Sequence, residues 1–244
     1  MKPVSPDLLF ERGHLMEYII RELFDPLIWE RTVVAYFPTF VKGMQNTFWI
    51  SMQALILAFI LGIITGVMRV SKSWAINGVA KAYIEVIRNT PLLVQLIIFY
   101  FGLGPLFNNN QSIPLVLGLG IFTGAYVAEI VRAGIQSVSR GQMEAALSVG
   151  MTYFQAMTLI ILPQAVRRIL PALAGQFISL IKDSSLVSVF GFAELTHAAN
   201  RVTAATFRAL VPNIFIAFVY FIIAYTLSQA VSIIEKKGAR SGQI

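Results

Sequence analysis

The sequence contains no cysteine and few charged residues: of 244 residues, 13% are Asp, Glu, Lys or Arg, whereas 57% are apolar. Without cysteine, disulfides, thiolate metal sites and cysteine nucleophiles are excluded. The two histidines, His14 and His197, lie far apart, so we expect surface roles for them and no metal site. The net charge of +7 does not indicate nucleic-acid binding, because so little polar surface accompanies it. This composition is typical of a protein embedded in a lipid bilayer.

Two kinds of enzyme motif are also missing. The pattern G-x-x-x-x-G-K-[ST], which cradles nucleotide phosphates, does not occur, and neither does H-E-x-x-H or a comparable arrangement of histidines or paired acids. The sequence therefore argues against the alternative of an intramembrane protease or transferase, and it predicts no catalytic, cofactor-binding or metal-binding residue. The first residues contain acids and two prolines instead of a basic stretch followed by an apolar one, so no cleavable signal peptide is expected.

Long uncharged stretches mark the expected membrane spans. A charge at mid-bilayer costs about 2.5 to 3.5 kcal/mol, and about 20 residues of helix cross the hydrocarbon. The polar turn 107–112 divides one uncharged stretch into a helical hairpin, in which Pro91 and Pro114 fit the first turn of each helix and Asn89 or Thr90 can cap the first. An all-α protein with about five spans is predicted, at 48–68, 91–106, 114–136, 171–190 and 210–234.

Periodicity does not determine where the fourth span lies, because residues 145–166 are uncharged as well. Pro163 and Gly150 would interrupt a helix centred there, whereas Pro171 can open a helix that continues to residue 190. We therefore favour 171–190, which places Lys182 and Asp183 in or near the membrane.

The orientation follows from the basic residues of the connections, since positively charged segments resist translocation. The connections after the first and third spans and the C-terminal tail are rich in Lys and Arg, which predicts that they are cytoplasmic. Residues 1–42 form an extracytoplasmic leader, followed by a transmembrane domain, 43–244. In the leader, Leu15, Ile19, Ile20 and Leu23 recur at helical spacing, which favours a helix on the outer interface over a loosely ordered leader.

A short segment in the third connection, 139–163, carries the functional signal. Ser139 and Gln142 have the spacing of a capping box, so a two-turn helix can begin there and end near Gly150. The small side chains of Ala145 and Ala146 would let this helix fit closely into a groove on another protein, with Arg140 and Glu144 available for polar contacts. The alternative is a solvated connecting helix without a partner.

The pattern E-A-A, three residues, G, nine residues, I-x-L-P, from Glu144 through Gly150 to Pro163, resembles the coupling motif of binding-protein-dependent ABC importer permeases. The sequences at 88–95, 129–137 and 182–186 resemble those of the polar amino acid branch, and the similarity covers about 45–235.

The resemblance implies a type I ABC importer permease fold with a cytoplasmic coupling helix, in the plasma membrane of a bacterium or archaeon. It implies the following partners: ABC ATPase subunits that hold ATP and Mg, a second permease chain, identical or a sister, an extracytoplasmic binding protein, and an amino acid that crosses by alternating access. No cofactor is implied on this chain.

Ionisable and polar groups within the spans are candidates for a substrate pathway. The carboxylate of an amino acid suits Lys182 and its ammonium suits Asp183, although this pair could instead mark the watery end of its helix. Glu129 and Arg132 lie three residues apart, so an internal ion pair is favoured over substrate contact, and Glu85 and Arg88 invite the same interpretation. Gln95, Ser184 and Ser185 are further candidates, or hydrogen-bond between spans.

A standalone secondary carrier or channel is the remaining alternative. Inverted repeats or a complete pore within one chain would favour it. No repeat is visible in the sequence, and five spans do not divide into two equal halves.

Overall fold

The computed structural model describes residues 12–108 and 110–240, and this part of the chain is helical without a strand, which confirms the expected all-α class. Residues 1–11 of the expected leader and the last four residues of the tail lie outside it. The helices form two units, Met1–Asn46 with Ala193–Ile222, and Thr47–Phe192 with Ile223–Ile244. Two helices contribute to both, α3 (Phe37–Arg69) and α11 (Leu210–Arg240).

The larger unit is built around α6 (Ser112–Ser137), which packs against α4 (Trp74–Arg88), α5 (Leu92–Leu103) and α9 (Leu162–Asp183). The side chains of α6 are buried along most of its length. Close packing requires glycine at two of its contacts: a Cβ on Gly134 would collide with Ile169 of α9, and one on Gly120 would collide with Leu57 of α3. The backbone of α6 therefore lies close to two neighbouring helices.

The smaller unit combines α1 (Arg12–Phe24), α2 (Pro26–Trp29) and a π-helical turn, Glu30–Val34, with α10 (Leu195–Thr206). The first part of α3 and of α11 complete it. Its core is apolar and consists of Phe40, Leu195, Ala198, Ala199, Val202 and Ile216.

Four described helical segments are long and apolar enough to cross a membrane, and the bent pair Trp74–Arg88 and Leu92–Phe107 gives a fifth by the same measure. The four are Phe37–Arg69, Ser112–Ser137, Tyr153–Phe190 and Leu210–Ile233. The expected first, third and fifth spans lie within the first, second and fourth of these segments. About five spans were predicted, and the structure agrees with that number.

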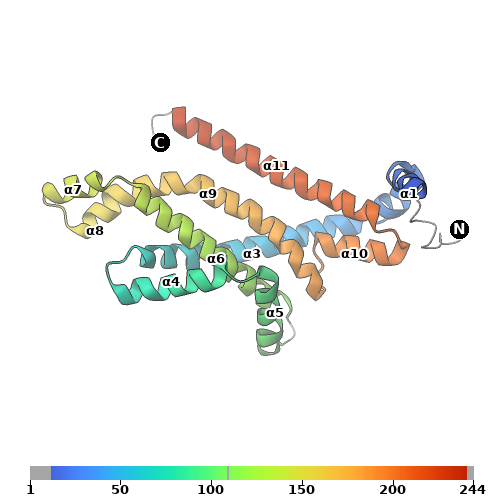
Figure 1. The fold of residues 1–244 in the computed structure, drawn as a ribbon, viewed down its shortest axis with the longest axis horizontal. Helices are drawn as coiled ribbons and strands as arrows, with labels where there is room; N and C mark the ends of the chain where they lie inside the picture. Colours follow the sequence, from blue (N-terminus) through green and yellow to red (C-terminus); the bar gives the residue numbers. More distant parts are fainter. Residues whose placement is uncertain (1–11, 109, 241–244) are drawn as a thin grey trace. The chain divides into compact units, whose positions relative to one another are not determined.

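The second span differs from the prediction. The helix α5 has 12 residues, too few to cross about 30 Å alone, and it meets α4 at a bend of 103°, which Figure 1 shows. The expected caps are wrong as well, because Asn89 Nδ2 donates to the Glu85 carbonyl and Thr90 Oγ1 to the Val86 carbonyl, at 2.7 and 2.9 Å. Both side chains thus complete the end of α4, and Pro91 precedes α5 without a side-chain cap.

The fourth span begins earlier than predicted, and the choice of 171–190 is corrected to Tyr153–Phe190. Pro163 does not interrupt this segment, since it lies in the first turn of α9, after a π-helical turn, Met157–Ile161. A proline, which has no N–H group, costs little stability there, because the N–H groups of a first helical turn have no partner within the helix. Pro171 lies inside α9 and does not begin it.

The expected N-terminal helix is present as α1, but its polar face is not wholly solvated. Glu22 is 1% exposed and forms an ion pair with Arg208, which follows α10. A buried charge is stabilised only when it is paired, so this contact ties α1 to the turn between α10 and α11.

Candidate functional site

The predicted coupling helix is present as α7, Arg140–Ser148, and ends at Gly150, whose φ of +86° suits glycine. The predicted capping box is wrong, because the side chain of Ser139 accepts no hydrogen bond at the start of α7. A capping box occurs instead at α8 (Tyr153–Ala156): Thr152 N donates to Gln155 Oε1 at 2.8 Å, and Gln155 N donates to Thr152 Oγ1 at 3.2 Å. The turn between the two helices is therefore fixed on its α8 side.

The two alanines of the motif differ in exposure. Ala146 is 6% exposed and packs inward, which corrects the expectation that it would contact another protein, whereas Ala145 is exposed together with Arg140 and Glu144. Apolar side chains that the sequence analysis did not single out are also exposed around α7, and they are Leu147, Val149 and Phe154. These three residues could have been predicted from their position, because they lie next to the motif in a connection that is expected to be polar. The segment thus presents a mixed apolar and charged surface, typical of a docking site.

The ends of the two helices that flank α7 are joined by side-chain hydrogen bonds. Arg168 Nη1 of α9 donates to the Ser137 carbonyl at the end of α6, at 2.5 Å, and Gln164 Nε2 donates to Gln142 Oε1 of α7 at 3.3 Å. Lys72, in the turn between α3 and α4, lies with its Nζ 4.9 Å from the centre of the Tyr153 ring. These contacts connect α7 to α9, α9 to the end of α6, and α8 to the turn after α3.

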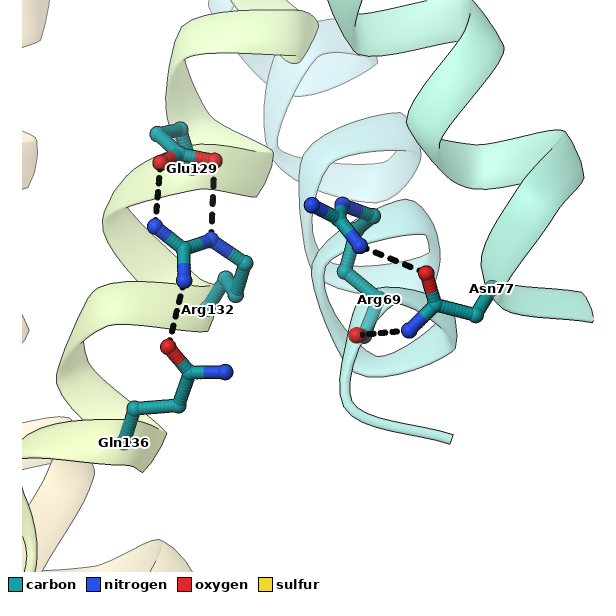
Figure 2. A network of polar contacts seen from close by, with 5 residues as sticks. All are labelled: Arg69, Asn77, Glu129, Arg132 and Gln136. Carbon is teal, nitrogen blue, oxygen red and sulfur yellow. Dashed lines mark hydrogen bonds and ion pairs between the residues drawn. The ribbon is translucent and has the colours of Figure 1, made fainter. Parts of the chain in front are cut away.

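Near the same end of α6, Glu129 and Arg132 form the predicted ion pair (Figure 2). Arg132 Nε donates to Glu129 Oε2 at 3.0 Å and Nη2 donates to Oε1 at 2.5 Å, and Nη1 also donates to Gln136. Such a two-point contact has a fixed geometry. Both charges are engaged within α6, as expected for a structural pair.

The expectation of a second pair, Glu85 with Arg88, is corrected. Glu85 lies 3.6 Å from Lys81 Nζ instead, and Arg88 lies over the ring of Tyr126, with its Cζ 5.0 Å from the ring centre. A neighbouring contact closes the turn between α3 and α4: Arg69 Nη1 donates to Asn77 Oδ1, and Asn77 Nδ2 donates to the Arg69 carbonyl, both at 2.6 Å (Figure 2).

The other candidate pathway residues divide into engaged and accessible groups. Ser184 is fully buried and donates to the Ile181 carbonyl at 2.7 Å. Gln95 is 5% exposed, and its Nε2 donates to Thr90 Oγ1 at 2.6 Å and to the Ile87 carbonyl at 2.7 Å. Gln95 therefore holds the bend between α4 and α5 together. Lys182 is exposed and Asp183 half-buried at the C-terminal end of α9, so these two side chains remain accessible.

Comparisons with known proteins agree with this architecture. Residues 58–237 match the family described as binding-protein-dependent transport system inner membrane component. The chain is 38% identical over 203 residues to the glutamine transport system permease protein GlnP of Escherichia coli (strain K12), covering 82% of this chain and 93% of that protein. It is 39% identical over 212 residues to the L-cystine transport system permease protein TcyB of Bacillus subtilis (strain 168), covering 86% and 90%.

A solved structure described as an amino acid ABC transporter with histidines is similar, with a TM-score of 0.79 and 44% identity over 84% of this chain and 96% of that one. The inward-facing MetNI methionine ABC transporter has the same fold, with a TM-score of 0.70 at 19% identity over 87% and 98%. The fold is thus that of the type I ABC importer permeases, as predicted. The chain belongs to the family of binding-protein-dependent transport system inner membrane components, the multi-pass permease subunits of ABC importers.

Proposed function

We propose that this chain carries a polar amino acid across the membrane, delivered by an extracytoplasmic binding protein and driven by a separate ABC ATPase. One observation carries the proposal: α7 with Gly150 forms an exposed, capped segment whose residues follow the E-A-A motif. The names of the relatives support the substrate class, since they include glutamine and L-cystine permeases. The permease itself makes and breaks no covalent bond.

In the proposed cycle, Arg140, Glu144, Ala145 and Gly150 contact the ATPase, and Ala146 supports α7 from within. ATP and Mg bind to the ATPase pair, whose closure would draw two coupling segments together, so a second permease chain, identical or a sister, is required. The Arg168–Ser137 hydrogen bond would pass this movement to α6 and α9. ATP shifts the equilibrium between the two access states only if it binds the complex more tightly in one of them than in the other.

The proposed orientation places α7 in the cytoplasm and the start of the chain outside. The basic residues on the connections support it, and so does the exposed apolar surface beside α7, which suits a soluble partner. The C-terminus is then cytoplasmic.

For the substrate pathway, Lys182 and Asp183 are the proposed contacts. Gln95, Ser184 and Glu129 have structural roles instead, because Gln95 holds the bend between α4 and α5 and the other two are engaged within their own helical segments. Lys182 and Asp183 have opposite charges and lie at the point where α9 becomes a 3-10 helix, Ser184–Phe190. Accessible charges of both signs suit the carboxylate and ammonium of an amino acid.

The test is co-purification of the chain with its ATPase, followed by ATP-driven amino acid uptake into liposomes. Glu144→Lys and Gly150→Val should release the ATPase and abolish uptake, while the chain still folds. The matched controls are Glu85→Lys on the exposed face of α4 and Gly78→Ala, where a Cβ has open space. Retention of the ATPase by the α7 variants, or uptake without ATP, would refute the proposal, and the latter result would support a standalone carrier.

A further inference from the structure

A second polar site lies in the smaller unit, between the first turns of α3 and the start of α10. It is a pocket of about 270 Å³, which we call the α3–α10 pocket, lined by Thr39, Lys42 and Gly43 on one side and Glu194, His197 and Arg201 on the other. Two contacts hold its walls in place. Asn46 Nδ2 donates to the Ala193 carbonyl at 2.7 Å, and a Cβ on Gly43 would come within 3.0 Å of the Glu194 carbonyl oxygen.

The accessible charge of the α3–α10 pocket is positive. Lys42 and Arg201 are both exposed. The carboxylate of Glu194 is fully buried, and it accepts hydrogen bonds from Thr196 N, His197 N and Tyr220 Oη at 2.9, 2.6 and 2.8 Å. Because these bonds turn its oxygens into the protein, Glu194 is not available to a ligand, whereas the ammonium and guanidinium groups are.

The position of Lys42 along α3 indicates at which level of the membrane the pocket lies. It precedes the long apolar run of this helix by a few residues. Trp49 is 67% exposed and lies seven residues further on, about 10 Å along the helix and on the same face. Exposed tryptophan is enriched at the boundary between hydrocarbon and headgroups. Lys42 therefore lies at the level of the lipid phosphates.

We propose that the α3–α10 pocket binds the phosphodiester headgroup of an anionic phospholipid in the leaflet at the N-terminal end of α3. Lys42 and Arg201 would pair with the phosphate from opposite sides, and a guanidinium can donate two parallel hydrogen bonds to it. A zwitterionic amino acid fits less well, because Glu194 is engaged and offers its ammonium no partner. The proposal does not depend on which solute is transported.

The experiment measures lipid binding to the purified full-length chain by native mass spectrometry. The chain is titrated in detergent with dioleoylphosphatidylglycerol or dioleoylphosphatidylcholine. We expect tighter binding of phosphatidylglycerol, and about tenfold or more weaker binding in the double variant Lys42→Ala with Arg201→Ala. The control, Arg31→Ala with Lys81→Ala, removes the same charge from exposed positions outside the pocket and should bind as the wild type does.

Three results would overturn the proposal: equal binding of the two lipids, equal loss in both double variants, or displacement of the lipid by inorganic phosphate or free glutamate at millimolar concentration. The last result would assign the pocket to a soluble anion. To exclude misfolding as the cause, Lys42→Arg, which keeps the charge, should retain the lipid. A loss of binding in that variant with an unchanged thermal unfolding midpoint would also contradict the proposal.

Discussion

Arg168 and Ser137 are joined across 31 positions of sequence, with the guanidinium of Arg168 donating to the Ser137 carbonyl at 2.5 Å. The bond closes the base of the loop that carries α7, because Ser137 ends α6 and Arg168 lies in the first turns of α9. The helix α7, the proposed coupling helix, is therefore flanked by two helices that are tied to each other.

Arg168→Ala should separate ATPase binding from transport. The exposed residues of α7 are unchanged, so the ATPase should still co-purify, but ATP hydrolysis should drive less uptake because α6 and α9 no longer move together. We expect the ratio of transported amino acid to hydrolysed ATP to fall severalfold in proteoliposomes. Arg168→Lys, which can still donate to the carbonyl, should recover part of the ratio, and an unchanged ratio in Arg168→Ala would contradict this role.

The different exposure of Ala145 and Ala146 predicts different effects of the same substitution. Ala146→Leu adds volume to a packed interior and should destabilise the chain by about 1–3 kcal/mol. Ala145→Leu should leave the thermal unfolding midpoint nearly unchanged and weaken ATPase binding, since the added side chain would protrude from α7. Thermal unfolding and co-purification of both variants measure the two effects, and the same result for both positions would show that the assignment of faces is wrong.

The contact of Gly134 with Ile169 predicts a destabilising substitution with a defined rescue. Gly134→Ala places a Cβ against Ile169 Cγ2 and should cost about 1–3 kcal/mol. Gly175→Ala, where a Cβ meets nothing within 4 Å, should be neutral or stabilising, because alanine favours helix more than glycine does. Ile169→Ala removes the methyl group that the new Cβ would meet. Gly134→Ala should therefore lower the unfolding temperature less in the Ile169→Ala background than it does in the wild type.

Glu194 should make the smaller unit less stable as the pH rises. Burial raises the pKa of this carboxyl, although hydrogen bonds from Thr196, His197 and Tyr220 oppose the shift. The folded chain then holds the proton more tightly than the unfolded chain does, so the stabilisation is complete below the unfolded pKa and is lost as the pH rises through the folded pKa. As the pH rises through that range, the thermal unfolding midpoint should fall more in the wild type than in Glu194→Gln. The same dependence of the midpoint on pH in both proteins would contradict the predicted shift.

Lys182→Ala and Asp183→Ala should reduce amino acid uptake while leaving ATPase binding intact. Each variant removes one charge that the proposed substrate contacts require, and neither lies in the coupling segment. Uptake of several amino acids in proteoliposomes measures the effect, and Ser188→Ala, in the same 3-10 helix but not among the candidate pathway residues, provides a control. If uptake and substrate dependence are unaltered in both variants, these residues do not contact the substrate and only mark the solvated end of α9.

The sequence predicted the first, third and fifth spans and the short helix α7 because each rests on a local property. Uncharged length determines whether a segment can cross, and the spacing from Glu144 to Pro163 is visible without knowledge of the fold. The ion pair of Glu129 with Arg132 was predictable for the same reason, since residues three apart meet on a helix.

The features that the sequence did not predict depend on tertiary contacts. The bend after α4 is held by Gln95, whose bonds to Ile87 and Thr90 exist only once α5 has turned. Pro163 was read as a break, but the preceding π-helical turn lets the helix continue. The ion pair of Glu22 with Arg208 joins residues that are 186 positions apart, so no local pattern indicates it.

The left-handed turn at Gly150 separates α7 from α8 and keeps the length of the intervening loop fixed. Adding or deleting one residue within α7 would rotate everything before it by about 100° relative to that turn, since an α-helix completes a turn in 3.6 residues. One residue inserted between Ala146 and Gly150 would place Glu144 at the half-buried position that Met143 occupies, and Ala146 at the exposed position of Ala145. The set of side chains that this segment exposes therefore depends on its residue count as much as on its sequence.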